Sequence, residues 1–565
     1  MSEMIYKYGI DFGTTNSSIA LRYRKSSTKE EFTTVFEISD EKPTTSIPSV
    51  ILVDSYGNIF VGDDAIENYK SLKTLKDVQF IRKIKMELDK LSEENPFFIE
   101  AGGKKIEIVE LVASILRKLR LEAEKSVSDY IDPKQLKGVV MGVPVQYGDI
   151  QKNILKKALV LAGFYKDSDD ADNYTEFVSE PVAVAVHYGL KLEKNTNVLV
   201  FDFGGGTLDI AVMNLQKQIG NEHLHPHETI AKDRITLGGE DFNELLFTGC
   251  ICKEYSVNEI KNQLNIPQNY ATDDNPQELW KYISSKPEYI DFVKTIEKCK
   301  WELSNKRTSD FSYIGENIHF PIRKIHREEF EEAIKVELKK IETMIGTMID
   351  KIVNLCKEKG AVEENIVIED ICDIDYVLLS GGSSLIPAVQ TRIVDIFGES
   401  KVLAEPLDKI ANKNSKRNKI KNSEVLQSIV KGLAVVGCRE MEIVEDVVDN
   451  DYGFWDDTDK TFEPIIEAGT KVRKTVIDRL SQNGISRDIR LSNPNASQAE
   501  IPIYQRNLNG IQRLGTITIE NVGGKEYRMY MTIDSKKGIL KVELYDTKRK
   551  TWMDYIPSEE RQFEI

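Results

Sequence analysis

The chain has 565 residues, of which 41% are hydrophobic and 30% are charged, and its formal net charge is −16. This composition is typical of a soluble globular protein of several domains and excludes a disordered or fibrous chain. The acidic balance argues against binding to nucleic acid or to an anionic membrane, since both need a basic surface. No apolar run is long enough to span a bilayer, so we expect a cytoplasmic protein without a membrane partner.

The first motif lies near the N-terminus, in the segment YGIDFGTTNSSIAL. An apolar run leads to Asp11, a polar turn contains Gly13, Thr14 and Thr15, and a second apolar run follows. This pattern predicts a strand, a tight turn and a returning strand. A single turn of this kind is a weak sign of a binding site, because many such turns are only hairpins.

A carboxylate opens the helix that is predicted from FVSEPVAVAVHYGL, where Glu180 precedes Pro181. Acidic residues at a helix N-terminus usually only cap the helix. Glu180, however, lies shortly before a glycine-rich segment, and a carboxylate in the same cleft could orient a water molecule for attack on a phosphate. Both interpretations stay open at this point.

The first motif is repeated in VLVFDFGGGTLDIAV, at residues 198–212. Asp202 ends the first apolar run, three glycines form the turn, and Thr207 and Asp209 precede the second run. Glycine lets backbone N–H groups approach a phosphate, and the aspartates offer hard oxygens for Mg²⁺ and its waters. Two related halves imply a cleft in which two hairpins hold one nucleotide from opposite sides.

Two later segments have the geometry of nucleotide contacts. The predicted helix TIEKCKWELSNK places Glu297, Lys300 and Ser304 near one side, although spacing alone favours a solvated face. The segment DYVLLSGGSSLIP predicts a buried strand, a turn at Gly381 and Gly382, and a helix N-terminus. At such a terminus the backbone can approach a ligand closely.

The hydrophobic pattern changes to a period of two from residue 452 onward. Short alternating runs such as GTITIE and YRMYMTID are separated by glycine-containing turns. They predict a separate antiparallel β-domain, with a sandwich as the simplest arrangement. The acidic segment MEIVEDVVDND before it is interpreted as a linker.

The order and rough spacing of these motifs resemble the seventy-kilodalton heat-shock chaperone family, the DnaK type. The matching segments are DFGTTNS, VPVQY, SEPVAVAVHYGL, FDFGGGTLDIAV, LGGEDFN, EKCKWELS and LSGGSSLIP, and FEPIIEAGTKV, IYQRN and TIDSKKGILKVELYD look like the family's substrate-binding β-domain. The resemblance implies an α/β fold with a two-lobed, actin-like nucleotide-binding domain with duplicated β-hairpin phosphate loops at residues 1–440. A linker at 441–451 and an antiparallel β-sandwich at 452–565 would follow. It also implies that the family's helical lid is absent, so that bound peptide would exchange quickly.

The resemblance further implies roles for the residues that match these motifs. Asp11 and Asp202 would position Mg²⁺, mainly through water, with Asp209 nearby, and Glu180 would help to orient the attacking water. The phosphates of ATP or ADP would be contacted by Gly13, Thr14, Thr15, Gly204, Gly205, Gly206 and Thr207. The adenosine would be held by Glu297, Lys300, Ser304, Gly381, Gly382 and Ser383.

Three positions depart from the family's pattern. Ile66 stands where we expect the family's catalytic lysine, after the V-G-x-x-A segment, and Lys70, one helical turn later, is the candidate substitute. Loss of one well-placed donor costs around 3 kcal/mol at such a site, so hydrolysis is expected to be slow. Leu385 replaces an arginine that the family places against the adenine. Glu176 replaces an arginine that docks the co-chaperone, and this reversed charge predicts rejection of the usual J-domain partner.

We therefore expect an ATPase that acts as an ATP-dependent chaperone, in which nucleotide state controls the binding of unfolded or extended apolar peptide. A J-domain co-chaperone and a nucleotide-exchange factor would be its partners. The alternative is a slowly hydrolysing or non-hydrolysing, nucleotide-gated scaffold for one dedicated partner protein. A filament-forming or sugar-kinase relative of the same superfamily is disfavoured by the C-terminal β-domain.

Overall fold

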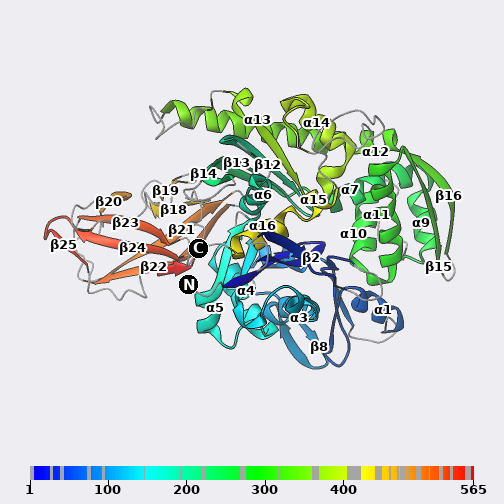
Figure 1. The fold of residues 1–565 in the computed structure, drawn as a ribbon, viewed down its shortest axis with the longest axis horizontal. Coiled ribbons are helices and arrows are strands. Elements are labelled where there is room, and N and C mark those ends of the chain that lie inside the picture. Colours follow the sequence, from blue (N-terminus) through cyan, green and yellow to red (C-terminus); the bar gives the residue numbers. More distant parts are fainter. Residues whose placement is uncertain are drawn as a thin grey trace.

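The computed structural model contains two α/β lobes and a C-terminal part made of strands (Figure 1). It describes residues 5–25, 30–38, 44–72, 78–91, 96–144, 147–190, 192, 194–217, 224–267, 275–315, 318–358, 368, 370–403, 422–438, 448, 450–456, 460–467, 470, 479, 484–490, 498–507, 510–520, 526–534, 539–553 and 562–564.

The first lobe is built on a sheet with the strand order β11-β10-β1-β2-β3, to which β4 is added beside β2. β1 runs antiparallel to β2 and parallel to β10. Helix α3 fills the core of this lobe because its apolar residues, among them Leu111, Ile115 and Leu119, recur every three or four positions on one face. The elements are β1 (Tyr6–Phe12), β2 (Asn16–Arg24), β3 (Glu31–Val35), β4 (Ile47–Pro48), α3 (Ile108–Glu124), β10 (Leu136–Val143), α4 (Asp149–Ala162), α5 (Ser168–Tyr174) and β11 (Thr175–Ser179).

The second lobe repeats this arrangement in a sheet with the order β14-β13-β12-β17. β12 runs antiparallel to β13 and parallel to β17, as β1 does to β2 and β10. Both copies of the repeated motif therefore form a hairpin beside a parallel strand. The elements are β12 (Thr196–Phe203), β13 (Leu208–Lys217), β14 (Leu224–Ile235), α12 (Arg327–Ala333), α13 (Lys335–Glu358), β17 (Tyr376–Ser380), α14 (Pro387–Phe397) and α15 (Asn422–Leu426).

Smaller groups of elements extend each lobe. In the first lobe they are β5 (Ile51–Val53), β6 (Ile59–Val61), α1 (Asp63–Leu72), β7 (Gln79–Ile81), α2 (Ile84–Asp89), β8 (Phe98–Ala101) and β9 (Lys104–Glu107). In the second lobe they are α7 (Gly239–Leu246), α8 (Cys252–Glu254), α9 (Val257–Gln263), α10 (Pro276–Ser285), α11 (Ile290–Asn305), β15 (Thr308–Gly315) and β16 (Ile318–His326). Short 3₁₀ or π turns connect several of these elements.

Two helices join the lobes at their base. α16 (Ser428–Cys438) packs on β1, β2 and β10 of the first lobe and on α6 (Glu180–Gly189), and α6 in turn packs on β12, β13 and β14 of the second lobe. In Figure 1, α16 (yellow) lies beside α6 near the centre of the two lobes. The helices approach so closely that a Cβ atom at Gly432 would overlap the carbonyl oxygen of Ala183.

The C-terminal strands form two antiparallel sheets, in the orders β19-β18-β21-β22 and β20-β23-β24-β25, with β26 beside β24. Residues of both sheets, such as Ile503 and Val542, belong to one buried core. The elements are β18 (Asp451–Asp456), β19 (Thr461–Ile466), β20 (Ser486–Arg490), β21 (Gln498–Asn507), β22 (Gly510–Glu520), β23 (Glu526–Asp534), β24 (Ile539–Asp546), β25 (Thr551–Trp552) and β26 (Gln562–Glu564). The sandwich arrangement and the domain boundaries at residues 440 and 451 stay predictions.

The contact between α16 and α6 predicts that Gly432→Ala destabilises the protein, by about 1–3 kcal/mol, because the added methyl group has no space. Gly346→Ala is the matched control. Gly346 is exposed on α13 and a Cβ atom there meets nothing within 4 Å, so the better helix former should stabilise by about 0.5–1 kcal/mol. Thermal unfolding of both variants measures the effect. Equal midpoints for the two variants would contradict the close packing.

Candidate functional site

The turns of the two hairpins lie against one another. A Cβ atom at Gly205 would overlap Oγ1 of Thr15, and one at Gly206 would lie 3.4 Å from Cγ2 of Thr14. The second turn is closed by the N–H of Gly204, which donates to the carbonyl oxygen of Thr207 at 3.0 Å. The hairpins predicted to share a ligand therefore face each other from two lobes, and glycine is required where they meet.

The loop that contains Gly238 and Gly239 packs against the turn of the second hairpin. The N–H of Gly239 donates to the carbonyl oxygen of Gly204 at 3.0 Å, and the N–H of Glu240 donates to that of Gly205 at 2.8 Å. A Cβ atom at Gly238 would overlap the backbone of Gly205. The two adjacent glycines of LGGEDF are the sequence signal for this close approach of another backbone.

Acidic side chains from both lobes gather at the turns. Asp202, Asp209 and Glu180 are buried, with exposed fractions of 5%, 1% and 6%, and Asp202 lies opposite Asp209 in the hairpin. Burial, followed by repulsion from Glu180, raises the pKa of Asp11 to about 7 and the pKa of Asp202 well above its ordinary value. Burial also raises the pKa of Asp209 to about 6. An uncompensated cluster of this kind favours a bound cation or a retained proton.

Two buried cations face these acids. Nζ of Lys85, on α2, donates to Oε1 of Glu180 at 2.6 Å, and both side chains are 7% exposed. Burial by itself lowers the pKa of Lys85, but Glu180 and Asp11 outweigh it and the pKa is raised. Arg234, on β14, has its Nε 3.8 Å from Oδ1 of Asp209. Four acids thus face two cations.

The residues present fit a hydrated magnesium ion. Oδ1 of Asp209 is buried and makes no hydrogen bond, and the acids outnumber the cations around it. Within the described residues, no group of three or more His, Cys, Asp or Glu side chains is arranged to ligate a metal directly. Mg²⁺ commonly keeps several of its waters and binds only one or two carboxylates directly. This is the coordination expected if Asp11 and Asp202 hold the ion mainly through water.

Lys85 is the residue that sequence reasoning missed. Ile66, where a family lysine was expected, is 4% exposed and packs with Val50 and Ile290, so it contributes an apolar contact between the lobes. Lys70 falls in α1, but its side chain lies outside the described residues. The role expected of Lys70 therefore stays a prediction, while α2 brings a second lysine, Lys85, into the site. The segment FIRKIKMELD showed only an ordinary helix.

The residues expected to hold adenosine gather near the second hairpin. Nζ of Lys300 donates to the carbonyl oxygen of Gly239 at 2.5 Å, and Oγ of Ser383 donates to that of Gly204 at 2.7 Å. Burial lowers the pKa of Lys300, against the opposing effect of Glu297. Ser304 donates within its own helix to the carbonyl oxygen of Lys300 at 3.1 Å.

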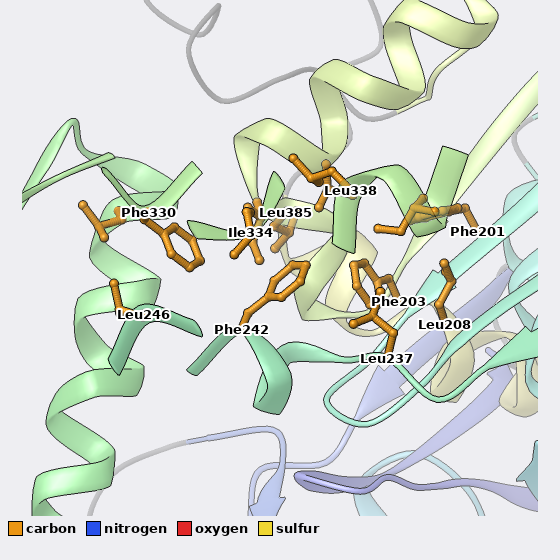
Figure 2. Close-up of a cluster of buried hydrophobic side chains, with 14 of the residues drawn as sticks. Phe201, Phe203, Leu208, Leu237, Phe242, Leu246, Phe330, Ile334, Leu338 and Leu385 are labelled. Atoms are coloured by element: carbon orange, nitrogen blue, oxygen red, sulfur yellow. The ribbon is translucent and has the colours of Figure 1, made fainter. Parts of the chain in front are cut away.

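The glycine pair and Leu385 close this region. Gly381 has a φ of +76°, and a Cβ atom there would overlap the carbonyl oxygen of Phe203, so glycine is required for the strand to turn at this place. Leu385 is 8% exposed and belongs to the hydrophobic core, where it lies among Ile334, Leu338 and Phe242 (Figure 2). The residue that replaces the family's arginine thus packs in the hydrophobic core of the second lobe.

Glu176 lies on β11 and forms an ion pair with Lys7 of β1. Its side chain is 37% exposed. The carboxylate that replaces the family's arginine is thus already engaged by a neighbouring cation, which weakens the charge it presents to a partner.

Two matching lobes that bring their hairpins together beside buried acids define a two-lobed α/β protein. A family model described as Hsp70 protein matches residues 7–409. The chain belongs to the Hsp70 family. Members of this family have an actin-like, two-lobed ATPase domain and bind nucleotide with Mg²⁺.

Curated relatives agree with the family assignment. The chaperone protein DnaK of Thermosipho melanesiensis is 26% identical over 404 residues, which are 70% of this chain and 56% of the relative. DnaK of Thermosipho africanus is 27% identical over 400 residues, 70% of this chain and 55% of the relative. The mitochondrial 70 kDa heat shock protein of Solanum tuberosum is 27% identical over 408 residues, 69% of this chain and 51% of the relative. The chain spans about half the length of the curated relatives it matches. In the part of the chain that the structure describes, no helix is long and apolar enough to cross a membrane.

The buried acids predict that stability depends on pH. Because the pKa of Asp11 is raised to about 7, the folded state holds a proton that the unfolded state releases above about pH 4. The free energy of unfolding of the protein without nucleotide and Mg²⁺ should therefore fall between about pH 4 and pH 7. Asp11→Asn, which mimics the protonated acid, should stabilise at pH 8 by on the order of 2 kcal/mol and change little at pH 4.5.

Differential scanning calorimetry at the two pH values measures this difference. Asp395→Asn, at an exposed position on α14, is the control and should shift the midpoint equally at both pH values. An Asp11→Asn variant whose midpoint differs from wild type by the same amount at pH 4.5 and pH 8 would show that Asp11 is ionised throughout.

Proposed function

We propose that the protein is an ATP-dependent chaperone of the DnaK type, which hydrolyses ATP between its lobes and thereby controls the binding of extended apolar peptide. The observation that carries the proposal is the pair of facing hairpins, with Asp202, Asp209 and Glu180 buried beside them, Asp11 partly buried at the end of β1, and Lys85 bound to Glu180. Such a site positions a phosphate chain and concentrates charge where a phosphoryl group is transferred.

Different residues of the site would bind the phosphates and the magnesium ion. Backbone N–H groups of the glycine turn and the hydroxyl groups of Thr14, Thr15 and Thr207 would hold the phosphates, as donors suited to an anion. Asp11 and Asp202 would hold the waters of a magnesium ion. When bound, ATP would supply the transferable phosphoryl group, and its magnesium ion would supply positive charge between the phosphates and the acids.

Glu180 would accept a hydrogen bond from the attacking water and so orient it. Lys85 holds the Glu180 side chain in place through a buried ion pair, with its Nζ 2.6 Å from Oε1. On this view Lys85 takes the role that the sequence had left to Lys70, and hydrolysis need not be slow for want of a lysine.

The closed arrangement of the lobes supports a nucleotide between them. Oη of Tyr69 donates to Oε2 of Glu288 at 3.4 Å, and Nη1 of Arg82 donates to the carbonyl oxygen of Ser284 at 3.4 Å. Together with the Ile66 contact, these bonds join the outer parts of the lobes above the hairpins.

Peptide binding is assigned to the C-terminal sheets, residues 452–565, and coupling to the segment at 441–451. Of that segment, Val448 is 4% exposed and its N–H donates to the carbonyl oxygen of Thr470 at 2.8 Å, so its end is anchored to the β-sheet core. Residues 439–447 lie outside the described residues. Unfolded polypeptide, a J-domain co-chaperone and a nucleotide-exchange factor are the proposed partners.

Glu180→Gln and Lys85→Gln are expected to lower the rate of single-turnover ATP hydrolysis, each by on the order of a hundredfold, because each removes a charge from the place where the water is oriented. ATP binding should persist in both variants. Lys90→Gln is the control, since Lys90 follows the same helix and pairs with Glu87 at the surface. Wild-type rates in Lys85→Gln would show that this lysine does not serve hydrolysis.

The nucleotide should also change the affinity for peptide. We expect a labelled, extended apolar peptide to bind more weakly with ATP than with ADP, by roughly the 5- to 150-fold that typical coupling free energies give, as measured by fluorescence anisotropy. The Glu180→Gln variant, held in the ATP state, should keep the weaker affinity. Equal affinities in both nucleotide states would refute coupling.

The scaffold alternative is favoured by one observation, the presence of Glu176 where the family has the arginine that docks the co-chaperone. A protein of this kind would bind ATP tightly without hydrolysing it above background. Single-turnover measurement on the wild-type protein separates the two functions.

A further inference from the structure

One buried arginine joins the two lobes inside the cleft. Nη2 of Arg234, on β14 of the second lobe, lies 3.1 Å from Oδ2 of Asp89, the last residue of α2. Ile84 and Leu88 anchor α2 in the core of the first lobe. The side chain of Arg234 is only 8% exposed, so little water competes for this contact.

The same arginine faces the acidic cluster. Arg234 is the cross-strand partner of Asp209, and its Nε lies 3.8 Å from Oδ1 of that residue, the oxygen that makes no hydrogen bond. Arg234 thus stands between an acid of the first lobe and an acid of the second.

Helix α2 carries both Lys85 and Asp89, the two residues of the first lobe that form these buried ion pairs. Lys85 and Asp89 are four residues apart, which places them on one face of the helix. Lys85 binds Glu180, and Asp89 binds Arg234. A movement of α2 relative to the second lobe therefore has to break or shift the Asp89 contact.

We propose that Arg234 is a positioning residue that Asp89 holds in place when the lobes are closed, and that Arg234 in turn fixes the side chain of Asp209. Separation of the lobes would release Arg234 from Asp89 and leave the Asp209 side chain with the hydrogen bond that its Oδ2 accepts from Oγ1 of Thr207 at 3.1 Å, and so less firmly held. The inference rests on the proposed function for its effect on hydrolysis, but the contact between the lobes can be tested without it.

The structural arm measures the distance between the lobes. Fluorophores are attached through non-natural amino acids at Leu121 and Ile322, which are 46% and 76% exposed on opposite lobes, because the chain has six cysteines. Energy transfer in the nucleotide-free protein should report a broader and longer distance distribution in both Asp89→Asn and Arg234→Gln. Distributions equal to wild type in both variants would overturn the proposed contact.

The kinetic arm uses single-turnover ATP hydrolysis as a function of ATP concentration. Arg234→Gln should lower the rate at saturating ATP by on the order of a hundredfold, as for a misplaced site group, with a smaller change in the half-saturating concentration. Arg234→Lys should restore part of the rate, and Asp89→Asn should lower the rate less than Arg234→Gln does. A wild-type rate at saturation in Arg234→Gln would overturn the positioning role.

Arg392→Gln is the matched control, because Arg392 belongs to the same lobe and is 43% exposed beside Glu342. It should leave both measurements unchanged. If the wild-type protein does not hydrolyse ATP, the proposed function fails, together with the effect on hydrolysis. The distances in Asp89→Asn and Arg234→Gln then still decide whether the contact holds the lobes together.

Discussion

The gathering of four acidic side chains, three of them buried, where the two lobes meet is the constraint on which the site depends. Each carboxylate loses hydration when it leaves water, and neighbouring carboxylates repel one another. The fold offsets this cost with Lys85 and Arg234, which reach the acids from different lobes. A buried ion pair adds little to stability as a whole, but removal of one partner leaves an unpaired charge and costs several kcal/mol. The cations are therefore as necessary to the architecture as the acids are to its chemistry.

The duplicated topology explains how the acids come together. Each lobe has a hairpin whose first strand is paired with a parallel strand, so Asp11 and Asp202 occupy matching places at the ends of β1 and β12. α6 and α16 join the lobes below, and Gly432 allows them to touch. Because the two sheets have the same topology and are joined at one end, the turns of their hairpins come to lie against each other.

Much of the hairpin arrangement could be predicted because short segments of the sequence specify it. Apolar runs before Asp11 and Asp202, with glycine or threonine after them, specify a strand and a turn without reference to the rest of the chain. Lys85 could not be found in this way, since nothing in FIRKIKMELD distinguishes it from a solvated lysine, and only packing of α2 in the first lobe directs it to Glu180. Leu385 is a different case. The family comparison shows only that it replaces an arginine, whereas its place beside Phe242 and Ile334 in the core follows from the packing of distant segments. The sequence shows the charge of Glu176 but not its ion-pair partner. Lys7 comes close to it only because β1 and β11 belong to the same sheet.

The pKa values of Asp11 and Asp209 are raised to about 7 and about 6, so both carboxyl groups exchange protons near neutral pH. A divalent cation that enters such a site competes with those protons, and each proton displaced passes to the solvent. Loading the cleft would thus acidify an unbuffered solution, and the apparent affinity for the cation would weaken as the medium becomes more acidic.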